Sequence, residues 1–158
     1  MASKLLILAA AALWPFSVQA ADMAKEGTDK LTVRFVNVSS FSEIKQGDAV
    51  VYTNDNSGVQ SASAGSLFDN LGVRCVGFFR LEGATGASKG YCVKGDNYGD
   101  QYWEDYQDIA GAGTSKILGS QGKFAGMTGD IDYTYEGVGN PNGRTLFVVS
   151  ETVRWKRP

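Results

Sequence analysis

Residues 72–94 read GVRCVGFFRLEGATGASKGYCVK, and this stretch indicates a β-hairpin. Two segments rich in Val, Phe, Tyr and Cys flank a central run of Gly, Ala, Thr and Ser, a composition typical of strand, turn and strand. A two-residue turn at Gly83–Ala84 would pair Cys75 directly with Cys92 in an antiparallel ladder. A looser turn would make the cysteines diagonal neighbours, and a bond between them would then require movement of the strands.

The N-terminal residues have the pattern of a secretory signal peptide. Lys4 supplies a positive charge, residues 5–13 form an uninterrupted apolar run, and a VQA sequence ends at Ala20. The run is too short to span a membrane, which takes about 20 apolar residues. We therefore expect a signal peptide over residues 1–20, one mature domain over residues 21–158, and export to the periplasm or the cell exterior. The alternative for the leading segment is a buried N-terminal helix.

Cys75 and Cys92 are the only cysteines of the chain. Because an even count in an exported protein favours a disulfide, we predict a bond between them. Such a bond would stabilise the fold by roughly 3 kcal/mol by restricting the unfolded chain. The alternatives are two buried free thiols or a catalytic thiol, and the second is disfavoured because the sequence has no histidine to act as its base.

Short β-type segments punctuated by glycines make up the rest of the sequence. The chain has 20 glycines without a collagen-like period, and no apolar stripe of helical period persists beyond about two turns. In residues 31–38, Leu31, Val33 and Phe35 share one face of an expected strand. The other expected strands are residues 49–53, 101–106, 114–118, 122–125, 131–135 and 145–155, and residues 57–66 form a stretch rich in Ser, Gly and Ala.

The number of these segments predicts an all-β fold, a single antiparallel barrel of about eight strands. A sandwich would also accommodate them. Closure has a physical reason, since the apolar segments 31–38 and 145–155 would be hazardous edges if unpaired, and pairing them with each other hides both. The interior of an eight-stranded barrel holds either packed side chains or one small ligand.

Composition excludes several functional classes. The net charge of −2 gives no electrostatic case for nucleic-acid binding. The lack of histidine excludes a Ser-His-Asp triad, imidazole acid–base chemistry and a His-containing zinc site. Residues 96–100 (DNYGD) fail the EF-hand spacing, so we expect a β-turn there, and residues 86–90 match G-x-S-x-G but are expected to form a hairpin turn. We predict no metal site and no cofactor.

Residues 122–129 read GKFAGMTG and carry a family resemblance. Gly126 and Gly129 permit a tight hairpin, and Phe124 would anchor the adjoining strand in the core. The run resembles the GkFaGaTG turn of the allene oxide cyclase-like and dirigent-like barrels. Residues 89–92, 99–100 and Trp103 are similar to exported bacterial members of that superfamily. The resemblance implies a calycin-like barrel that works through its mouth or interior, and it carries over no catalytic residue.

Residues 101–108 (QYWEDYQD) are densest in reactive side chains. On a strand, Tyr102, Glu104 and Tyr106 share one face, and a carboxyl group between two tyrosines inside a barrel would have a raised pKa suited to general acid or base catalysis. The alternative, which the pattern favours, is an exterior strand with Glu104 in water and Trp103 in the core. The candidate catalytic residues are therefore Glu104, Tyr102 and Tyr106, and the candidate ligand-binding residues are Trp103 and Phe124. We expect Phe78, Phe79, Phe124, Phe147 and Trp155 to pack in the core rather than to cage a ligand.

Three functions are compatible with these features. The first is binding of a small hydrophobic or aromatic ligand in the barrel, which needs only an apolar lining with a few polar groups. The second is a cofactor-free cyclase or isomerase that holds a reactive substrate in one conformation. The third is a structural or interaction protein with a filled barrel. A cavity would argue against the third, and an ionisable group in that cavity would favour the second over the first. We expect no nucleic-acid partner and no membrane span, and the oligomeric state stays open.

Overall fold

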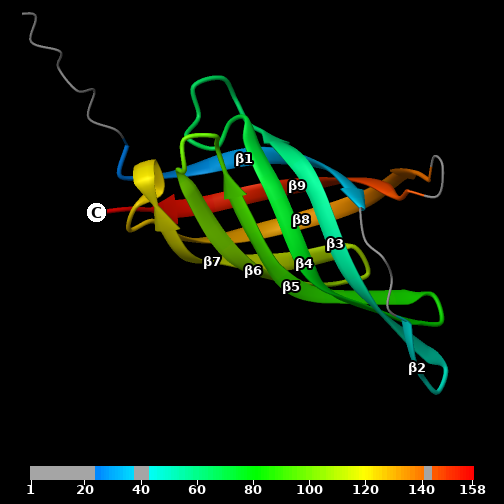
Figure 1. The fold of residues 1–158 in the computed structure, drawn as a ribbon. Coiled ribbons are helices and arrows are strands. Elements are labelled where there is room, and N and C mark those ends of the chain that lie inside the picture. The colour runs from blue at the N-terminus through cyan, green and yellow to red at the C-terminus, as the bar shows by residue number, and fades with distance from the viewer. Residues whose placement is uncertain (1–23, 38–42, 141–143) are drawn as a thin grey trace, which may run out of the picture.

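One antiparallel sheet contains all the strands of residues 24–37, 43–140 and 144–158, the parts of the chain that this computed structural model describes. The elements are β1 (Glu26–Asn37), β2 (Glu43–Gln46), β3 (Ala49–Ser61), β4 (Leu71–Glu82), β5 (Thr85–Gly95), β6 (Gln101–Ile109), β7 (Ala112–Gln121), the 3₁₀ helix η1 (Gly122–Phe124), β8 (Thr128–Gly139) and β9 (Leu146–Lys156). β1 pairs with both β9 and β3, so eight strands close into a barrel and β2 remains as an extra strand beside β3 (Figure 1). The predicted all-β barrel is confirmed.

The side chains of β1 alternate between the barrel interior and the outside. Leu31, Val33 and Phe35 are buried on the inner face, as predicted, whereas Arg34 between them is exposed. β1 and β9 pair along 11 positions, from Glu26 with Lys156 to Val36 with Leu146. The two longest apolar segments thus cover each other's edges, which is the reason for closure inferred from the sequence.

The cysteine hairpin has the tightest of the predicted geometries. Glu82 pairs with Thr85, so only Gly83 and Ala84 lie in the turn, and Gly83 adopts a φ of 59° that suits glycine. Cys75 and Cys92 are directly paired and joined by a disulfide. The predicted register and bond are confirmed. The turn is shorter than expected, however, because residues 86–90 belong to β5 and not to the connection.

Loss of this disulfide should cost roughly 3 kcal/mol of unfolding free energy, because the bond closes a loop in the unfolded chain. We expect Cys75→Ala/Cys92→Ala to lower the stability by about this amount relative to the oxidised protein in urea unfolding. Both cysteines are about 5% exposed. Since buried free thiols would also resist labelling in the folded protein, alkylation is done in urea without reductant, where we expect no label and two labels per chain would contradict the bond.

Three other expectations are corrected. The strand expected over residues 49–53 is longer, because β3 continues to Ser61 and includes the first five residues of the stretch rich in Ser, Gly and Ala, which pair with β1 and β4. Residues 122–125 were expected to form a strand, but residues 122–124 form the helix η1. The strand β7 ends at Gln121 because Gly122 adopts a positive φ of 65°, which is incompatible with an extended strand. Phe78 is 59% exposed on the outer face of β4 and is not in the core.

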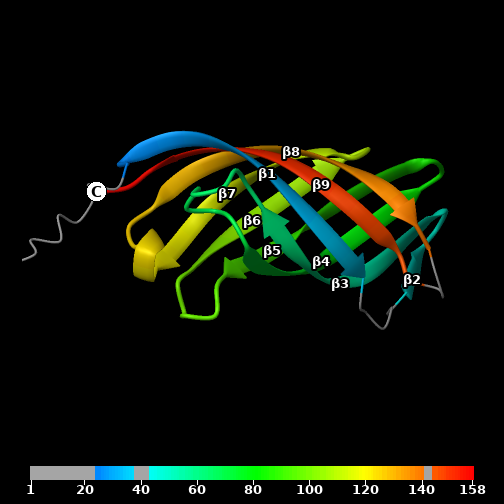
Figure 2. The same cartoon turned by 90° about the horizontal axis from the view of Figure 1, so that it is seen from above.

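The two ends of the barrel differ in how they are filled. The connection between β3 and β4 and the helix η1 lie at the end of the barrel where the C-terminus lies (Figures 1 and 2). They contribute Phe68 and Phe124, which are fully buried. The ring of Phe68 contacts the rings of Tyr102, Phe124 and Trp155, with centroids 5.7, 5.9 and 5.8 Å apart. This end is packed with aromatic side chains, so any ligand space lies towards the opposite end.

Candidate functional site

A cavity of about 540 Å³ occupies the half of the barrel away from η1. This volume is within the range of small-molecule sites, which is roughly 300–1,000 Å³. Aromatic rings form much of its wall: Phe35, Tyr52, Phe79, Tyr106, Tyr133, Tyr135 and Phe147. Its polar lining includes the carboxyl groups of Glu104, Asp108 and Glu151 and the amides of Asn37, Asn54 and Asn56. The filled-barrel alternative expected no such space.

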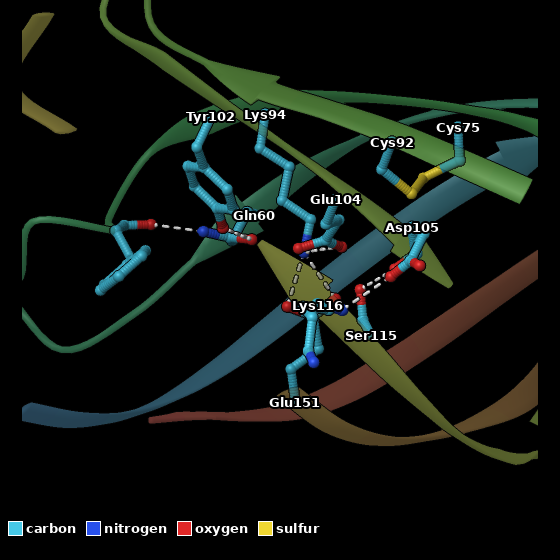
Figure 3. A network of polar contacts seen from close by, with 11 residues as sticks. Gln60, Cys75, Cys92, Lys94, Tyr102, Glu104, Asp105, Ser115, Lys116 and Glu151 are labelled. Atoms are coloured by element: carbon cyan, nitrogen blue, oxygen red, sulfur yellow. Dashed lines mark hydrogen bonds and ion pairs between the residues drawn. A yellow bond between two sulfur atoms is a disulfide. The ribbon is translucent and has the colours of Figure 1, made fainter. Parts of the chain in front are cut away.

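A buried ion-pair cluster is formed by Lys94, Glu104 and Glu151 (Figure 3). It lies between the filled end, to which Tyr102 belongs, and the cavity, which the two glutamates line. The Lys94 Nζ atom donates to both carboxyl oxygens of Glu151 at 2.7 Å and lies 3.0 Å from Oε1 of Glu104. The exposed fractions are 0% for Lys94, 2% for Glu104 and 7% for Glu151. Because Glu104 and Glu151 contact the cavity and Lys94 does not, the lysine supports the floor of the cavity from behind.

The environment of Glu104 raises the pKa of its carboxyl group towards neutral pH. Burial raises the pKa of Glu104 to about 7; the charge of Lys94 opposes this shift and the charge of Glu151 adds to it. Its Oε2 atom has no hydrogen-bond partner among the described residues. The nearby Ser115 hydroxyl donates its proton to the main-chain oxygen of Asp105. One buried oxygen at the cavity floor is therefore available to a ligand.

The pKa of Lys94 moves in the opposite sense to the usual effect of burial. Burial acts to lower this pKa, but the charges of Glu104 and Glu151 outweigh it and leave the pKa above its ordinary value. Lys94 therefore stays protonated, and the three groups together carry one positive charge and up to two negative charges. Burial disfavours the charged form of Glu104, and one lysine shared by two glutamates does not fully offset this effect, so the pKa of Glu104 stays raised.

Asp108 forms a second polar group of the cavity, further from the floor. It follows Glu104 by four residues on β6, which corresponds to about 13 Å along an extended strand. Its carboxylate accepts hydrogen bonds from Ser88, from Tyr133 at 3.2 Å and from Tyr135 at 3.5 Å. Burial, and after it the charge of Asp108, raises the pKa of Tyr133 above its ordinary value. The tyrosine hydroxyls therefore remain protonated donors.

Two paired glycines make room for the Tyr106 ring inside the barrel. Gly77 on β4 faces Gly90 on β5, and a Cβ atom at either would meet both the opposite backbone and the Tyr106 hydroxyl. That hydroxyl donates to Oδ1 of Asn54 at 3.2 Å, and burial raises its pKa to about 12. The glycine pair thus positions a neutral phenol on the cavity wall.

Of the three candidate catalytic residues predicted from the sequence, two line the cavity and one does not. Glu104 and Tyr106 line the cavity, whereas Tyr102 lies below the floor, fully buried, with its hydroxyl 3.4 Å from Gln60. The favoured placement of Glu104 in water is wrong, because β6 turns the face carrying Tyr102, Glu104 and Tyr106 inward.

Neither candidate ligand-binding residue lines the cavity. Trp103 is on the outer face of β6 and 37% exposed, so its expected core placement is also wrong. Phe124 packs in the filled end, and Phe79 and Phe147 contribute to the cavity wall. A role for Trp103 or Phe124 in binding would have to be indirect.

Sequence reasoning missed Lys94 and Glu151, although both carried a signal. Glu151 interrupts the alternating series Phe147, Val149, Val153 and Trp155, and a strand places every member of that series on one face. Lys94 follows Cys92 by two residues and so shares the inward face of β5. What the sequence could not show is that these side chains meet across the barrel.

The described residues hold no group of three or more His, Cys, Asp or Glu side chains placed to bind a metal ion. In the connection between β5 and β6, Asp96 accepts the main-chain N–H groups of Tyr98 and Asp100 and pairs with Lys123 at 2.8 Å. Its carboxylate is thus engaged in shaping the turn. Within the same described parts of the chain, no helix has the length and apolar character needed to cross a membrane.

These features define a closed antiparallel barrel with one packed end and one aromatic cavity over an ionisable floor. No protein-family model and no curated protein matches the chain. Its fold is similar to two solved pterocarpan synthase dirigent proteins, each 11% identical to it. The first, GePTS1, has a TM-score of 0.53 and the match covers 85% of this chain and 93% of that one. The second, PsPTS1, has a TM-score of 0.54 with 85% and 99% covered. At this identity the likeness shows the fold, a dirigent-like barrel, and nothing about activity.

Proposed function

We propose that this protein binds a small molecule with aromatic or other apolar character inside the open half of its barrel. The observation that carries the proposal is the cavity of about 540 Å³, whose exposed surface is mostly apolar, with seven aromatic rings in the wall and polar groups that can orient a ligand. A barrel stabilised only for structure would gain by filling this space, since unfilled apolar volume weakens a fold. The packing at the other end shows that this chain does fill its interior elsewhere.

A side chain placed in the cavity should block binding. Gly137 lines the cavity, and a Cβ atom there meets nothing within 4 Å, so Gly137→Trp can enter without displacing backbone. We expect this variant to weaken binding of the neutral fluorescent probe N-phenyl-1-naphthylamine by about tenfold or more, because the ring competes for the same volume. The measurement is the rise in probe fluorescence on titration.

The matched control is Glu136→Trp, which adds the same ring one residue earlier on the exposed face of β8. It should leave probe affinity unchanged, and circular dichroism should show both variants folded. Equal affinity of wild type and Gly137→Trp would contradict binding in this cavity.

We propose further that the protein is exported, as its leading sequence predicts. Residues 1–20 lie outside the described residues, and the support is the disulfide, which persists in oxidising compartments. Native mass spectrometry of protein purified from its own host tests both proposals together. A chain beginning at Ala21 with a retained small molecule is expected, whereas a chain that keeps residues 1–20 would contradict export.

A second candidate is a cofactor-free cyclase or isomerase, and Glu104 is the observation that favours it. A carboxyl group with a pKa of about 7, one oxygen unpartnered at the cavity floor, can donate or accept a proton at neutral pH. Extracts of the host incubated with wild type should then yield a product that is not formed with Glu104→Gln. The same product from both proteins would argue against Glu104 catalysis and leave binding as the function.

A further inference from the structure

The charge facing the cavity has one sign. Among its lining residues, the described part of the chain contributes three carboxyl groups, those of Glu104, Asp108 and Glu151, and no lysine or arginine. Lys94 lies behind the floor, with 0% exposure, and its ammonium group is engaged by both glutamates. These three carboxyl groups are 2–7% exposed, so water screens their charges less than it would at the surface. Such a cavity repels anions and attracts cations.

Two oxygen atoms of the cavity lining lack a hydrogen-bond partner among the described residues, and both are acceptors when Glu104 is ionised. Oε2 of Glu104 and Oδ1 of Asn56 are buried, with their residues 2% and 7% exposed, and neither has a hydrogen-bond partner among the described residues. A buried acceptor without a donor is costly, by about 1–3 kcal/mol, unless something supplies the hydrogen bond. A ligand that fits this floor is therefore a hydrogen-bond donor.

The register brings both acceptors to one level of the barrel. Asn56 on β3 pairs with Cys75, Cys75 with Cys92, and Cys92 with Glu104 on β6. The two acceptors thus flank the disulfide in a row across four neighbouring strands. By contrast, Asp108 already accepts three hydroxyl hydrogen bonds and adds charge rather than a free acceptor.

We propose that the ligand is an organic cation: a primary or secondary amine whose N–H groups donate to Oε2 of Glu104 at the cavity floor, on an aromatic or apolar body that packs against the ring-lined wall. This inference rests on the proposed binding function and names its ligand class. The aromatic wall favours such an amine for two reasons: the rings bury the apolar body of the ligand, and the faces of the rings attract its positive charge.

Binding of the amine should be coupled to loss of a proton from Glu104. Four titratable groups act on Glu104: Lys94 from β5, Glu151 from β9, Tyr102 from β6 and Tyr133 from β8. Since burial raises the pKa of Glu104 to about 7, this carboxyl is neutral at pH 6 and charged at pH 8. An aliphatic amine stays charged over that range, so its affinity should rise with pH.

Three probes of one shape test the charge preference: 2-naphthylmethylamine, 2-naphthylmethanol and 2-naphthoate. Calorimetric titration at pH 8 should show the amine binding about tenfold more tightly than the alcohol, with the carboxylate weakest. At pH 6 the advantage of the amine over the alcohol should shrink severalfold, and the affinity of the alcohol should not change.

Glu104→Gln should remove most of the preference for the amine over the alcohol, and circular dichroism should show that the variant is folded. The matched control, Glu136→Gln, removes an exposed charge from β8 and should keep the preference. If the alcohol or the carboxylate binds wild type as tightly as the amine, the cation proposal is overturned and cavity binding stands. If none of the three binds, both proposals fail.

Discussion

Lys94→Met should destabilise the protein by about 3–5 kcal/mol at pH 8, the largest effect we expect from any single substitution. The change removes the cation that both Glu104 and Glu151 contact and leaves two carboxyl groups buried together. Methionine fills a similar volume, so the loss comes from the unpaired charges and not from a void. The measurement is urea unfolding of the oxidised protein.

Two comparisons isolate this cause. Lys94→Met/Glu151→Gln removes both members of the closest pair and should recover more than half of the lost stability, because a neutral pair needs no counter-charge. Lys116→Met removes an exposed lysine that lies 3.9 Å from Asp130, and it should change stability by less than about 0.5 kcal/mol. A loss below about 1 kcal/mol for Lys94→Met would show that the cluster is better solvated than its burial indicates.

Glu104→Gln should change how stability depends on pH. The pKa of Glu104 rises from its ordinary 4.5 to about 7 in the folded state, so folding favours the protonated form. The stabilisation this supplies is complete below pH 4.5 and is lost as pH rises through 7, because the unfolded chain releases its proton first. Wild type should therefore lose about 3 kcal/mol between pH 5 and pH 8 relative to the glutamine variant.

Unfolding in urea at several values between pH 5 and pH 8 measures this difference. Glutamine mimics the protonated carboxyl and its oxygen can still accept from Lys94, so the variant should be as stable as wild type at pH 5 and more stable at pH 8. Glu136→Gln, on the exposed face of β8, should follow wild type at every pH. A constant difference between wild type and Glu104→Gln would show that Glu104 does not titrate in this window.

The two expected results bear on function as well as on stability. A cluster of one lysine and two glutamates is costly to bury, and replacing it with apolar side chains would serve a purely structural barrel at least as well. The cluster lies under an aromatic cavity, where its charges would act on a molecule that enters. Under the proposed function, the cluster forms part of the floor on which a ligand would bind.

Much of the local structure could be predicted from the sequence. The turn at Gly83–Ala84 determined which residues of β4 and β5 face each other, and from that the disulfide followed. The alternation of Leu31, Val33 and Phe35 determined the inner face of β1. These features succeed because a tight turn and a period of two depend only on neighbouring residues.

The candidate site could be predicted only in part. The grouping of Glu104 with Tyr106 on one face was correct, but the pattern favoured the wrong face, because a strand with a tryptophan on one side and tyrosines on the other has apolar bulk on both. Packing at the filled end of the barrel determines which face of β6 points inward. There Tyr102 contacts Phe68 and Phe124, rings from segments far away along the chain, and this turns Glu104 inward with it.

The sequence by itself therefore predicted an all-β protein and favoured a closed barrel, and it indicated a hairpin register that would pair Cys75 with Cys92. Only the tertiary structure decided which end of the barrel is filled and which charges meet inside it. Lys94 and Glu151 are 57 residues apart, and no local pattern links them. They meet because β1 pairs with both β3 and β9, which sets the stagger of all eight strands around the barrel and so the level at which each inward side chain lies.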